Sequence, residues 1–486
     1  MTVCQFANSR PGDRNHGDLE DACDLLVTPS SEIHLKSART KRRMTVRLRE
    51  ALEDGIRLDG LEGRVTLAGG PGGRLRVGGP KGCLAIVAER FARTFGVQWV
   101  DEAVRIPWPS PHSLDDLVEA CAAEARQLVA GRRFAVRVKR RGRHPWRAPD
   151  AERSIGAALL SYSAGVDLTS PEVTVRVLVL GEAAWLLRRR LPGPAGFPPG
   201  TQPRLLCLLS GGIDSAVAAW LMMRKGSRVD FVHFTLECAQ SEHAMAVASE
   251  LWHRWGAGSR PLFWQVDFRA VAGDLRTNVH SRDRQVTLKA AMLQAAWRVA
   301  RAAGYPALVT GDSVGQVSSQ TLANLAAVDS CHDALVLRPL AGLTKEEIVE
   351  RARRIGTYEL STRAKEVCDL SDGPVETAAD PVALARALEV LGGDLVEGCL
   401  AEGWRVTSLA HWAPGAPSPP VVSDVPPGRR VVRAEDLRAG AVGVEPLALV
   451  GEDAPHAASE LAARGHDVLV VVGRDEKPQH AGGRSL

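Results

Sequence analysis

The chain has 486 residues, of which 45% are hydrophobic and 24% charged, and this balance is typical of a folded protein with about three domains. The longest uncharged apolar runs are shorter than the ~18 residues that span a bilayer, and no secretion signal opens the chain, so we expect a cytoplasmic protein without a membrane segment. Nine cysteines without a CxxC pair argue against a disulfide framework and a zinc knuckle.

The net charge of +4 is divided unevenly along the chain. Residues 1–200 contain 31 Lys and Arg against 23 Asp and Glu, a balance of +8, whereas residues 201–486 contain 30 against 34, a balance of −4. This asymmetry predicts that the front part of the chain binds a polyanion.

The front part reads as an extension followed by two mixed α+β regions. Residues 1–23 form the extension, and residues 24–110 contain a strand at 24–28, a helix at about 38–52 and a hairpin of strands 65–68 and 75–77. The glycine cluster between these strands lacks a closing Lys-Ser/Thr, so it predicts a turn and not a phosphate loop. Residues 111–191 contain helices at 114–130 and 152–160 and strands at 134–139 and 173–179.

A linker at 192–202 separates these regions from the rest, since 192–200 holds four prolines and three glycines. In residues 203–395, near-continuous apolar strands at 205–209, 229–234, 262–266 and 307–310 alternate with helices. This pattern predicts a doubly wound parallel sheet, buried on both faces. A Pro-rich linker at 396–428 leads to a small α/β region at 429–486, with strands at 447–450 and 468–472 and a helix at about 457–464.

The sharpest motif is SGGIDS at residues 210–215, which directly follows a predicted strand and directly precedes a predicted helix. Gly211 and Gly212 allow a tight turn and close approach of backbone N–H groups to a ligand. Ser210 and Ser215 add hydroxyl donors, and the positive end of the helix favours an anion. The motif lacks the lysine of a Walker A loop. It therefore predicts an anion-binding site at the carboxyl edge of a parallel sheet and does not favour γ-phosphate transfer.

The hexapeptide resembles the SGGxDS loop of the PP-loop ATP pyrophosphatases, which cleave ATP between its α and β phosphates. Residues 24–395 as a whole resemble the tRNA 4-thiouridine synthetase (tRNA sulfurtransferase) family. The resemblance includes a ferredoxin-like motif, SEIHLKS at 31–37, a THUMP RNA-binding motif, FAVRVKRRG at 134–142, and the linker GFPPGTQ at 196–202. It continues in TGDSVGQVSSQT at 310–321 and LRPL at 337–340.

This resemblance implies that the loop at 210–215 binds ATP together with Mg²⁺. Asp214 would be a catalytic or magnesium-organising carboxylate, and Lys345 would offset charge on the α-phosphate during adenylation. The resemblance assigns the remaining nucleotide contacts to residues at the strand ends and in later motifs: Leu208, Leu209, His233, Phe234, Lys289, Gly311 and Gln320.

A cysteine is the second chemical requirement, because a thiolate is both the nucleophile and the sulfur carrier. The resemblance assigns this role to Cys368, in EVCD at 366–369, where the charged neighbours argue against a core position. Cys238 is a candidate resolving thiol and Cys331 a further one, whereas Cys207, inside a predicted core strand, is expected to be structural.

The tail departs from the family pattern. Many bacterial members end in a rhodanese-like domain whose loop cysteine carries the persulfide, but no cysteine follows Cys399 here. Residues 429–486 therefore resemble a degenerate rhodanese-like domain that cannot carry sulfur.

Three basic stretches are candidates for binding RNA phosphates. Residues 132–147 contain eight cations and no acid, residues 36–49 contain seven and no acid, and residues 188–190 add three arginines. In the strand at 134–139, apolar and basic residues alternate, so that one face packs and the other presents cations. The RNA-binding candidates in these stretches are Lys36, Arg42, Arg43, Arg137, Lys139, Arg140, Arg141 and Arg143.

The expected function is ATP-dependent tRNA sulfur transfer. Uridine 8 of tRNA would be adenylated at O4, and sulfur from a cysteine persulfide, supplied by a cysteine desulfurase, would give 4-thiouridine. The alternatives are sulfur transfer in thiamine thiazole biosynthesis, an RNA-binding protein that has lost catalysis, and an adenylating enzyme for a small molecule. The sequence leaves open whether the chain forms a homodimer.

Overall fold

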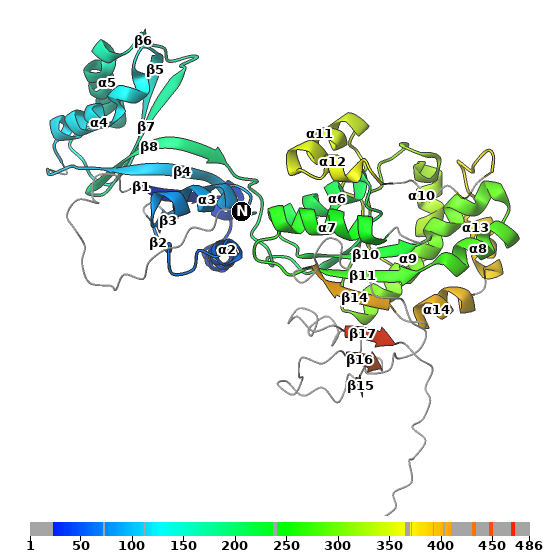
Figure 1. Ribbon diagram of the computed structural model, residues 1–486. Helices are drawn as coiled ribbons and strands as arrows, with labels where there is room; N and C mark the ends of the chain where they lie inside the picture. Colours follow the sequence, from blue (N-terminus) through cyan, green and yellow to red (C-terminus); the bar gives the residue numbers. More distant parts are fainter. Residues whose placement is uncertain are drawn as a thin grey trace, which may run out of the picture. The chain divides into compact units, whose positions relative to one another are not determined.

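The structure is a computed structural model that describes residues 23–70, 73–110, 112–236, 241–364, 370, 372–391, 393–401, 404–409, 430–433, 447–450 and 468–471. These residues divide into two units (Figure 1). The first comprises the described residues of 1–35, 53–93 and 97–195, and the second those of 36–52, 94–96 and 196–486. Within this described part, no helix combines the length and apolar character needed to cross a bilayer.

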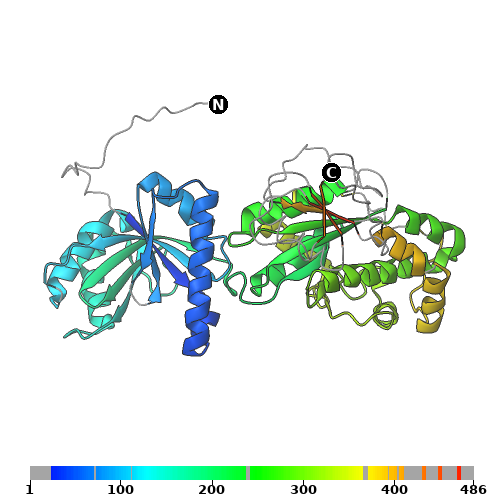
Figure 2. The same cartoon turned by 90° about the horizontal axis from the view of Figure 1, so that it is seen from below.

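The first unit is built on one eight-stranded sheet (Figure 2). Its strands lie in the order β2-β3-β1-β4-β8-β7-β5-β6, and only the pairs β5–β6 and β5–β7 are parallel. The strand bounds are β1 (Cys23–Pro29), β2 (Thr66–Gly69), β3 (Leu75–Gly78), β4 (Val97–Ile106), β5 (Arg133–Arg141), β6 (Gly165–Val166), β7 (Val173–Leu180) and β8 (Ala183–Pro192). The pairing of β4 with β8 joins the predicted regions 24–110 and 111–191 in one sheet.

Helices α1 (Ser31–His34), α2 (Ala38–Leu58), α3 (Lys81–Phe91), α4 (Leu114–Val129) and α5 (Ala148–Leu159) accompany this sheet, followed by a short 3-10 turn, η2 (Leu160–Tyr162). The division between the units falls within α2, after Leu52. Side chains of α4 and α5 pack on Phe134, Val136 and Val138 of β5 to form the core of this end of the unit. The predicted hairpin of β2 and β3, the helix α4 and the strands β5 and β7 are all confirmed.

Helix α3 and strands β4 and β8 were not predicted, and for the two strands the reason is electrostatic. Both strands lie in the middle of the sheet, and charged residues interrupt the alternation of apolar and polar residues in their sequences. The register pairs Asp101 with Arg190 and Glu102 with Arg189, and Asp101 is fully buried. Arg190 Nε lies 2.6 Å from Asp101 Oδ1. The charges thus neutralise each other within the sheet, which a single segment of sequence cannot show.

The second unit is a sheet with helices on both faces (Figure 1). Its strands lie in the order β13-β12-β9-β10-β11-β14-β17-β16-β15, and the strands from β13 to β11 are parallel. The bounds are β9 (Leu205–Leu208), β10 (Val229–Thr235), β11 (Leu262–Asp267), β12 (Leu308–Val309), β13 (Val336–Leu337), β14 (Trp404–Ser408), β15 (Arg430–Arg433), β16 (Leu447–Val450) and β17 (Val468–Val471). The predicted doubly wound parallel sheet is confirmed.

Two groups of helices cover this sheet. Helix α6 (Ile213–Arg224) packs with α7 (Ser241–Trp255) and α11 (Lys345–Ile355), and α7 also contacts α12 (Tyr358–Ser361). The other group is centred on α9 (Arg284–Ala302) and contains α8 (Arg269–Asn278), α10 (Leu322–Asp329), α13 (Pro381–Val390) and α14 (Gly393–Ala401). Apolar side chains of α9 and strands β9 to β12 form the main core. Two short 3-10 turns, η3 (Ser281–Asp283) and η4 (Ser318–Gln320), precede α9 and α10.

Short segments of the front part of the chain complete the second unit. Phe95 lies 5.6 Å from Trp220 of α6 and 5.8 Å from Trp255 of α7, measured between ring centroids. Ala51 of α2 lies beside Gly258, where an added Cβ would come within 2.9 Å of the alanine methyl. These residues therefore belong to the same packed unit as the parallel sheet.

The tail strands extend the sheet of the second unit. β14 pairs antiparallel with β11 and with β17, while β15, β16 and β17 are parallel to one another. The strands predicted at 447–450 and 468–472 are thus confirmed, and the helix predicted at 457–464 lies outside the described residues. The described tail strands continue an existing sheet edge, so the likeness of residues 429–486 to a rhodanese-like domain stays a proposal.

Candidate active site

The glycine-rich loop lies at the carboxyl edge of the parallel sheet, between β9 and α6. Gly211 has a φ of +87°, a backbone conformation that other residues adopt only with strain. The side chain of Ser210 accepts a hydrogen bond from the Gly212 N–H at 3.2 Å, and the Ser210 and Ser215 hydroxyl oxygens lie 3.3 Å apart. The two serines therefore close the loop over its glycines, at the N-terminus of a 12-residue helix.

Gly311 follows β12 and meets this loop from the neighbouring strand. A Cβ at Gly311 would lie 2.7 Å from Ser215 N and 2.9 Å from the carbonyl carbon of Asp214. Any side chain would therefore collide with loop backbone, which cannot move aside cheaply. The structure brings the predicted residues Gly311, Asp214 and Ser215 into direct proximity.

Asp214 sits in the first turn of α6 and contacts two donors from later parts of the chain. Lys345 Nζ lies 2.8 Å from Asp214 Oδ1 and 3.1 Å from Oδ2. The side-chain amide of Gln316 donates to Asp214 Oδ2 at 2.7 Å. The lysine side chain is about half exposed, so it is free to face a ligand. Gln316 was not singled out from the sequence, although it lies inside the motif at 310–321.

Local sequence explains how Lys345 reaches this position. Thr344 caps α11 by accepting a hydrogen bond from the Glu347 N–H, and the Glu347 side chain accepts from the Thr344 N–H, which completes a capping box. Gly356, with φ +83°, ends the helix. Lys345 is thereby held as the first residue of a helix that packs on α6.

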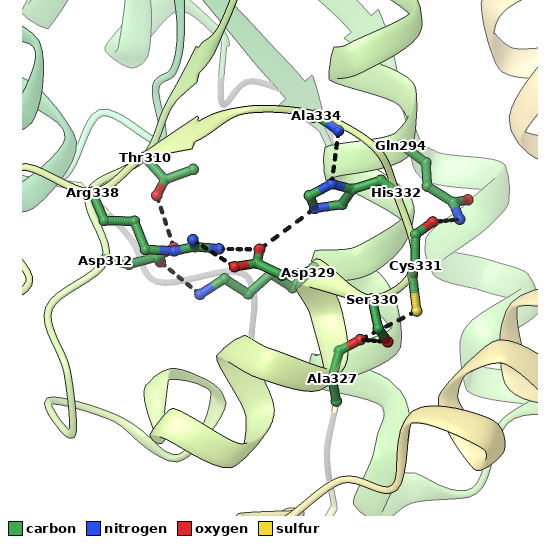
Figure 3. Close-up of polar contacts among 11 residues, drawn as sticks. Gln294, Thr310, Asp312, Ala327, Asp329, Ser330, Cys331, His332, Ala334 and Arg338 are labelled. Atoms are coloured by element: carbon green, nitrogen blue, oxygen red, sulfur yellow. Dashed lines mark hydrogen bonds and ion pairs between the residues drawn. The ribbon is translucent and has the colours of Figure 1, made fainter.

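Lys289 of α9 belongs to a charge network beside this site. Figure 3 labels Asp312, Arg338 and Asp329 of this network. Lys289 Nζ lies 2.6 Å from Asp312 Oδ1, and Arg338 Nε lies 3.2 Å from Asp312 Oδ2. Arg338 also forms a two-pronged pair with Asp329, at 2.6 and 2.9 Å. Burial alone would raise the pKa of Asp312, but Lys289, the Thr310 hydroxyl and Arg338 outweigh it and hold this pKa below its ordinary value.

Asp312 and Arg338 were not among the predicted site residues, yet both lie in the quoted motifs. Each follows a short apolar strand, β12 or β13, and a charged residue in such a place was the available signal, because a buried ion needs a partner.

The ends of β9 and β10 form the other wall predicted for the nucleotide. Leu209 N donates to the Val232 carbonyl at 2.9 Å, and His233 Nδ1 lies 2.8 Å from the Leu209 carbonyl oxygen. Burial lowers the pKa of His233, so the ring is neutral, and its proton is on Nδ1 because a carbonyl oxygen can only accept. The Phe234 side chain packs in the core against Phe268. The Phe234 ring is therefore not available to a ligand in this structure, whereas Leu208 is partly exposed.

Gln320 has a structural role in the loop that the sequence did not predict. Its side-chain oxygen accepts a hydrogen bond from the Ser313 N–H at 3.2 Å, and its own carbonyl accepts from the Gly315 N–H at 2.9 Å. These bonds close the loop 313–320, which also carries Gln316. Gln320 thus shapes the loop in this structure, and its contact with a nucleotide stays a prediction.

The two predicted redox cysteines, Cys368 and Cys238, lie outside the described residues. Cys207 is fully buried in β9, and burial raises the pKa of its thiol, which agrees with a structural role. Burial also raises the pKa of Cys331, and its thiol lies 3.4 Å from the Ala327 carbonyl oxygen (Figure 3). A thiol held in this protonated state is a poor sulfur nucleophile.

The predicted RNA-binding cations differ in their surroundings. On β5, Arg137 and Lys139 are exposed while Val136 and Val138 are buried, so the predicted alternation is confirmed. Arg137 donates to the Leu168 carbonyl, Arg140 stacks 5.7 Å from the Trp146 ring centroid, and Lys36 lies over Phe197. A further group is exposed: Arg42, Arg43, Arg141 and Arg143.

The run at 188–190 is a different case. Arg188 pairs with Glu124, Arg189 with Glu89 and Glu102, and Arg190 with Asp101. Acids of the same unit thus compensate these charges, and the contribution of this run to phosphate binding stays a prediction.

Comparisons with known proteins show what this chain is similar to. A family model described as thiamine biosynthesis protein (ThiI) matches residues 200–390, and a THUMP domain model matches residues 111–187. A tRNA sulfurtransferase of Desulfurococcus amylolyticus is 37% identical over 395 residues, which cover 80% of this chain and 79% of that protein. A probable tRNA sulfurtransferase of Aeropyrum pernix is 40% identical over 361 residues, 74% and 89% of the two chains.

Among solved structures, a 4-thiouridine synthetase–RNA complex with bound ATP superposes with a TM-score of 0.65 and 24% identity. The match covers 80% of this chain and 99% of that one. This likeness supports the same fold.

Proposed function

Because this chain belongs to the tRNA sulfurtransferase family, we propose that it uses ATP to activate a tRNA uridine and then replaces O4 of that uridine with sulfur. The observation that carries the proposal is the arrangement of Asp214, Lys345 and Gly311 around the SGGIDS loop. The loop offers backbone donors and a helix N-terminus to phosphates, and Lys345 supplies a half-exposed cation. The relatives are named for sulfur transfer to tRNA, and the structural neighbour binds RNA and ATP.

In the first step, O4 of the uridine attacks the α-phosphate of ATP, and pyrophosphate leaves. The Ser210–Ser215 loop holds the phosphates, and Lys345 offsets the negative charge that grows on the α-phosphate. The ends of β9 and β10, at Leu209 and His233, hold the adenosine. Lys289, fixed by Asp312, completes the pocket.

Magnesium fits this arrangement as a companion of ATP. Among the described residues, no group of three or more His, Cys, Asp or Glu side chains is arranged to hold a metal ion. Mg²⁺ is commonly held by one or two carboxylates together with substrate phosphates and water. Asp214 is the carboxylate that stands at the loop, and bound Mg²⁺ would neutralise phosphate charge there.

In the second step, a persulfide on Cys368 attacks C4 of the activated uridine, and AMP leaves. The resulting disulfide between Cys368 and the new sulfur on C4 is broken by a second thiol, for which we propose Cys238. That thiol forms a disulfide with Cys368 and releases 4-thiouridine, and a cellular reductant then restores both thiols. A cysteine desulfurase would load the persulfide, in the cytoplasm.

We further propose that the target is uridine 8 of tRNA, and that the exposed cations of β5 and α2 bind RNA phosphates. Arg137 and Lys139 on β5, and Arg42 and Arg43 on α2, point to backbone contacts, which position an RNA without reading its sequence. The THUMP match includes β5. The family description also names thiamine biosynthesis, but the tail lacks a cysteine for sulfur relay, so tRNA is the favoured acceptor.

The test compares wild type, Cys368→Ser and the matched control Cys331→Ser on tRNA that lacks thiouridine. Each protein is incubated with ATP, Mg²⁺, a cysteine desulfurase and cysteine, and the nucleosides are separated by chromatography and identified by mass. We expect 4-thiouridine from wild type and Cys331→Ser, but only pyrophosphate release from Cys368→Ser. Wild type that forms no 4-thiouridine contradicts the proposed function.

A further inference from the structure

We propose that Gln316 is a positioning residue for the adenylation step, which holds the Asp214 carboxylate in place when Lys345 turns to the phosphates of ATP. The inference rests on the proposed function and concerns a residue to which the motif resemblance assigns no role. In the described part of the chain, Asp214 has two side-chain partners, Lys345 and Gln316.

The two partners differ in what they can do. Lys345 spans both oxygens of Asp214 with a long and half-exposed side chain, so it can leave for an anionic ligand. The Gln316 amide occupies Oδ2 alone, at 2.7 Å, and carries no charge that a phosphate would attract. When the lysine leaves, the amide is the donor that keeps the carboxylate in its orientation, with Oδ1 available to the loop and its ligands.

The orientation of the amide is set by chemistry. An ionised carboxylate only accepts hydrogen bonds, so the NH₂ group of Gln316 must face Asp214. The opposite atom, Gln316 Oε1, is shielded from solvent and has no hydrogen-bond partner among the described residues. A side chain selected for stability alone would avoid a buried acceptor without a partner. The position of this amide is therefore better explained by its contact with Asp214 than by packing.

The surrounding loop is built to present this side chain. The Gln316 N–H donates to the Ser313 carbonyl, and Gly315 takes a positive φ of 76° to make the turn. Ser313 Oγ donates to the Leu343 carbonyl at 2.9 Å. Leu343 lies two residues before Lys345. The two partners of Asp214 are therefore held in fixed register with each other.

The first part of the test measures steady-state pyrophosphate release with ATP and tRNA for wild type, Gln316→Leu, Gln316→Glu and a matched control, Gln294→Leu. Gln294 also donates one side-chain hydrogen bond, to the Cys331 carbonyl, but it does not contact Asp214. We expect both Gln316 variants to lower kcat about 10- to 100-fold, with the KM for ATP within about threefold of wild type. The Glu variant keeps the volume, removes the donor and places a second carboxylate beside Asp214, so we expect it to be at least as impaired as the Leu variant.

The second part is a double-mutant cycle with Asp214→Asn, with melting temperatures recorded for every protein. If Gln316 acts through Asp214, adding Gln316→Leu to Asp214→Asn lowers kcat by less than about threefold. Equal losses in Gln316→Leu and Gln294→Leu, or a full further loss in the Asp214→Asn background, would overturn the proposal. Wild type that releases pyrophosphate without forming 4-thiouridine overturns the proposed function but not the role of Gln316, and wild type that releases no pyrophosphate overturns both.

Discussion

Replacing Asp312 with asparagine should destabilise the second unit, because this carboxylate compensates two cations in a buried place. Asp312 is 5% exposed and lies 2.6 Å from Lys289 and 3.2 Å from Arg338. Removing one partner of a buried pair costs about 3–5 kcal/mol. Arg338 keeps its pair with Asp329, and asparagine retains one acceptor oxygen. We therefore expect the free energy of unfolding to fall by about 2–4 kcal/mol.

The matched control is Asp329→Asn, which makes the same chemical change on the other carboxylate that contacts Arg338. Asp329 is 43% exposed, so solvent screens its pair and the expected cost is below about 1 kcal/mol. Thermal unfolding followed by circular dichroism should show a melting temperature lowered by about 5–15 °C for Asp312→Asn and by only a few degrees for Asp329→Asn. Equal shifts for the two variants would refute the argument that burial decides the cost.

The same contacts predict a dependence on pH. The folded pKa of Asp312 is below its ordinary value of 3.8, so its stabilising effect is present above pH ~4 and is lost as the pH falls through the folded pKa. The Asp312→Asn variant has no carboxylate at this position, so its stability does not include this pH-dependent contribution. The difference in melting temperature between wild type and Asp312→Asn should therefore shrink below pH 4, and a constant difference would contradict the assignment.

Three more results are expected. Gly311→Ala should lower the rate of pyrophosphate release more than 100-fold, because the added Cβ would lie 2.7 Å from loop backbone. The control Gly273→Ala, whose Cβ would meet open space, should leave this rate unchanged and raise the free energy of unfolding by about 0.5–1 kcal/mol. In filter-binding assays, Lys139→Ala should weaken tRNA binding and reduce the salt dependence of the affinity by about one phosphate contact. Arg189→Ala should change both less, because its charge is already paired. Equal effects of the two variants would contradict the proposed RNA-binding surface. Deleting residues 429–486 should retain 4-thiouridine formation but expose the edge of β14, so that light scattering detects aggregation; loss of sulfur transfer by a monomeric deletion variant would be evidence for a relay through the tail.

The sequence could predict elements whose signal is local. The apolar strands β9 to β12 and the SGGIDS turn are each readable within a few residues, because burial on both faces and a tight turn restrict residue type directly. Resemblance to a family then located Asp214 and Lys345, 131 positions apart, and the structure joins them at 2.8 Å.

What could not be predicted depends on partners that are distant in the chain. The charges of β4 and β8 obscured two central strands, since Asp101 and Arg190 neutralise each other only across the sheet. Gln316 and Asp312 lie in the motif at 310–321, but their roles follow from contacts with residues far away in the chain. Gln316 contacts Asp214, and Asp312 contacts Lys289 and Arg338. The roles of the cysteines also could not be predicted from their positions alone, because the reactivity of a thiol depends on its burial and on neighbouring charges.

The division of the chain between the two units bears on how such proteins can be rearranged. The chain passes from one unit to the other after residues 35, 52, 93, 96 and 195. A fragment that begins at the linker would therefore lack residues 36–52 and Phe95, and would expose Trp220 and Trp255, which Phe95 contacts. Recombination at a single junction therefore cannot transfer the second unit intact to a protein with another first unit. We expect the two units to have been inherited together.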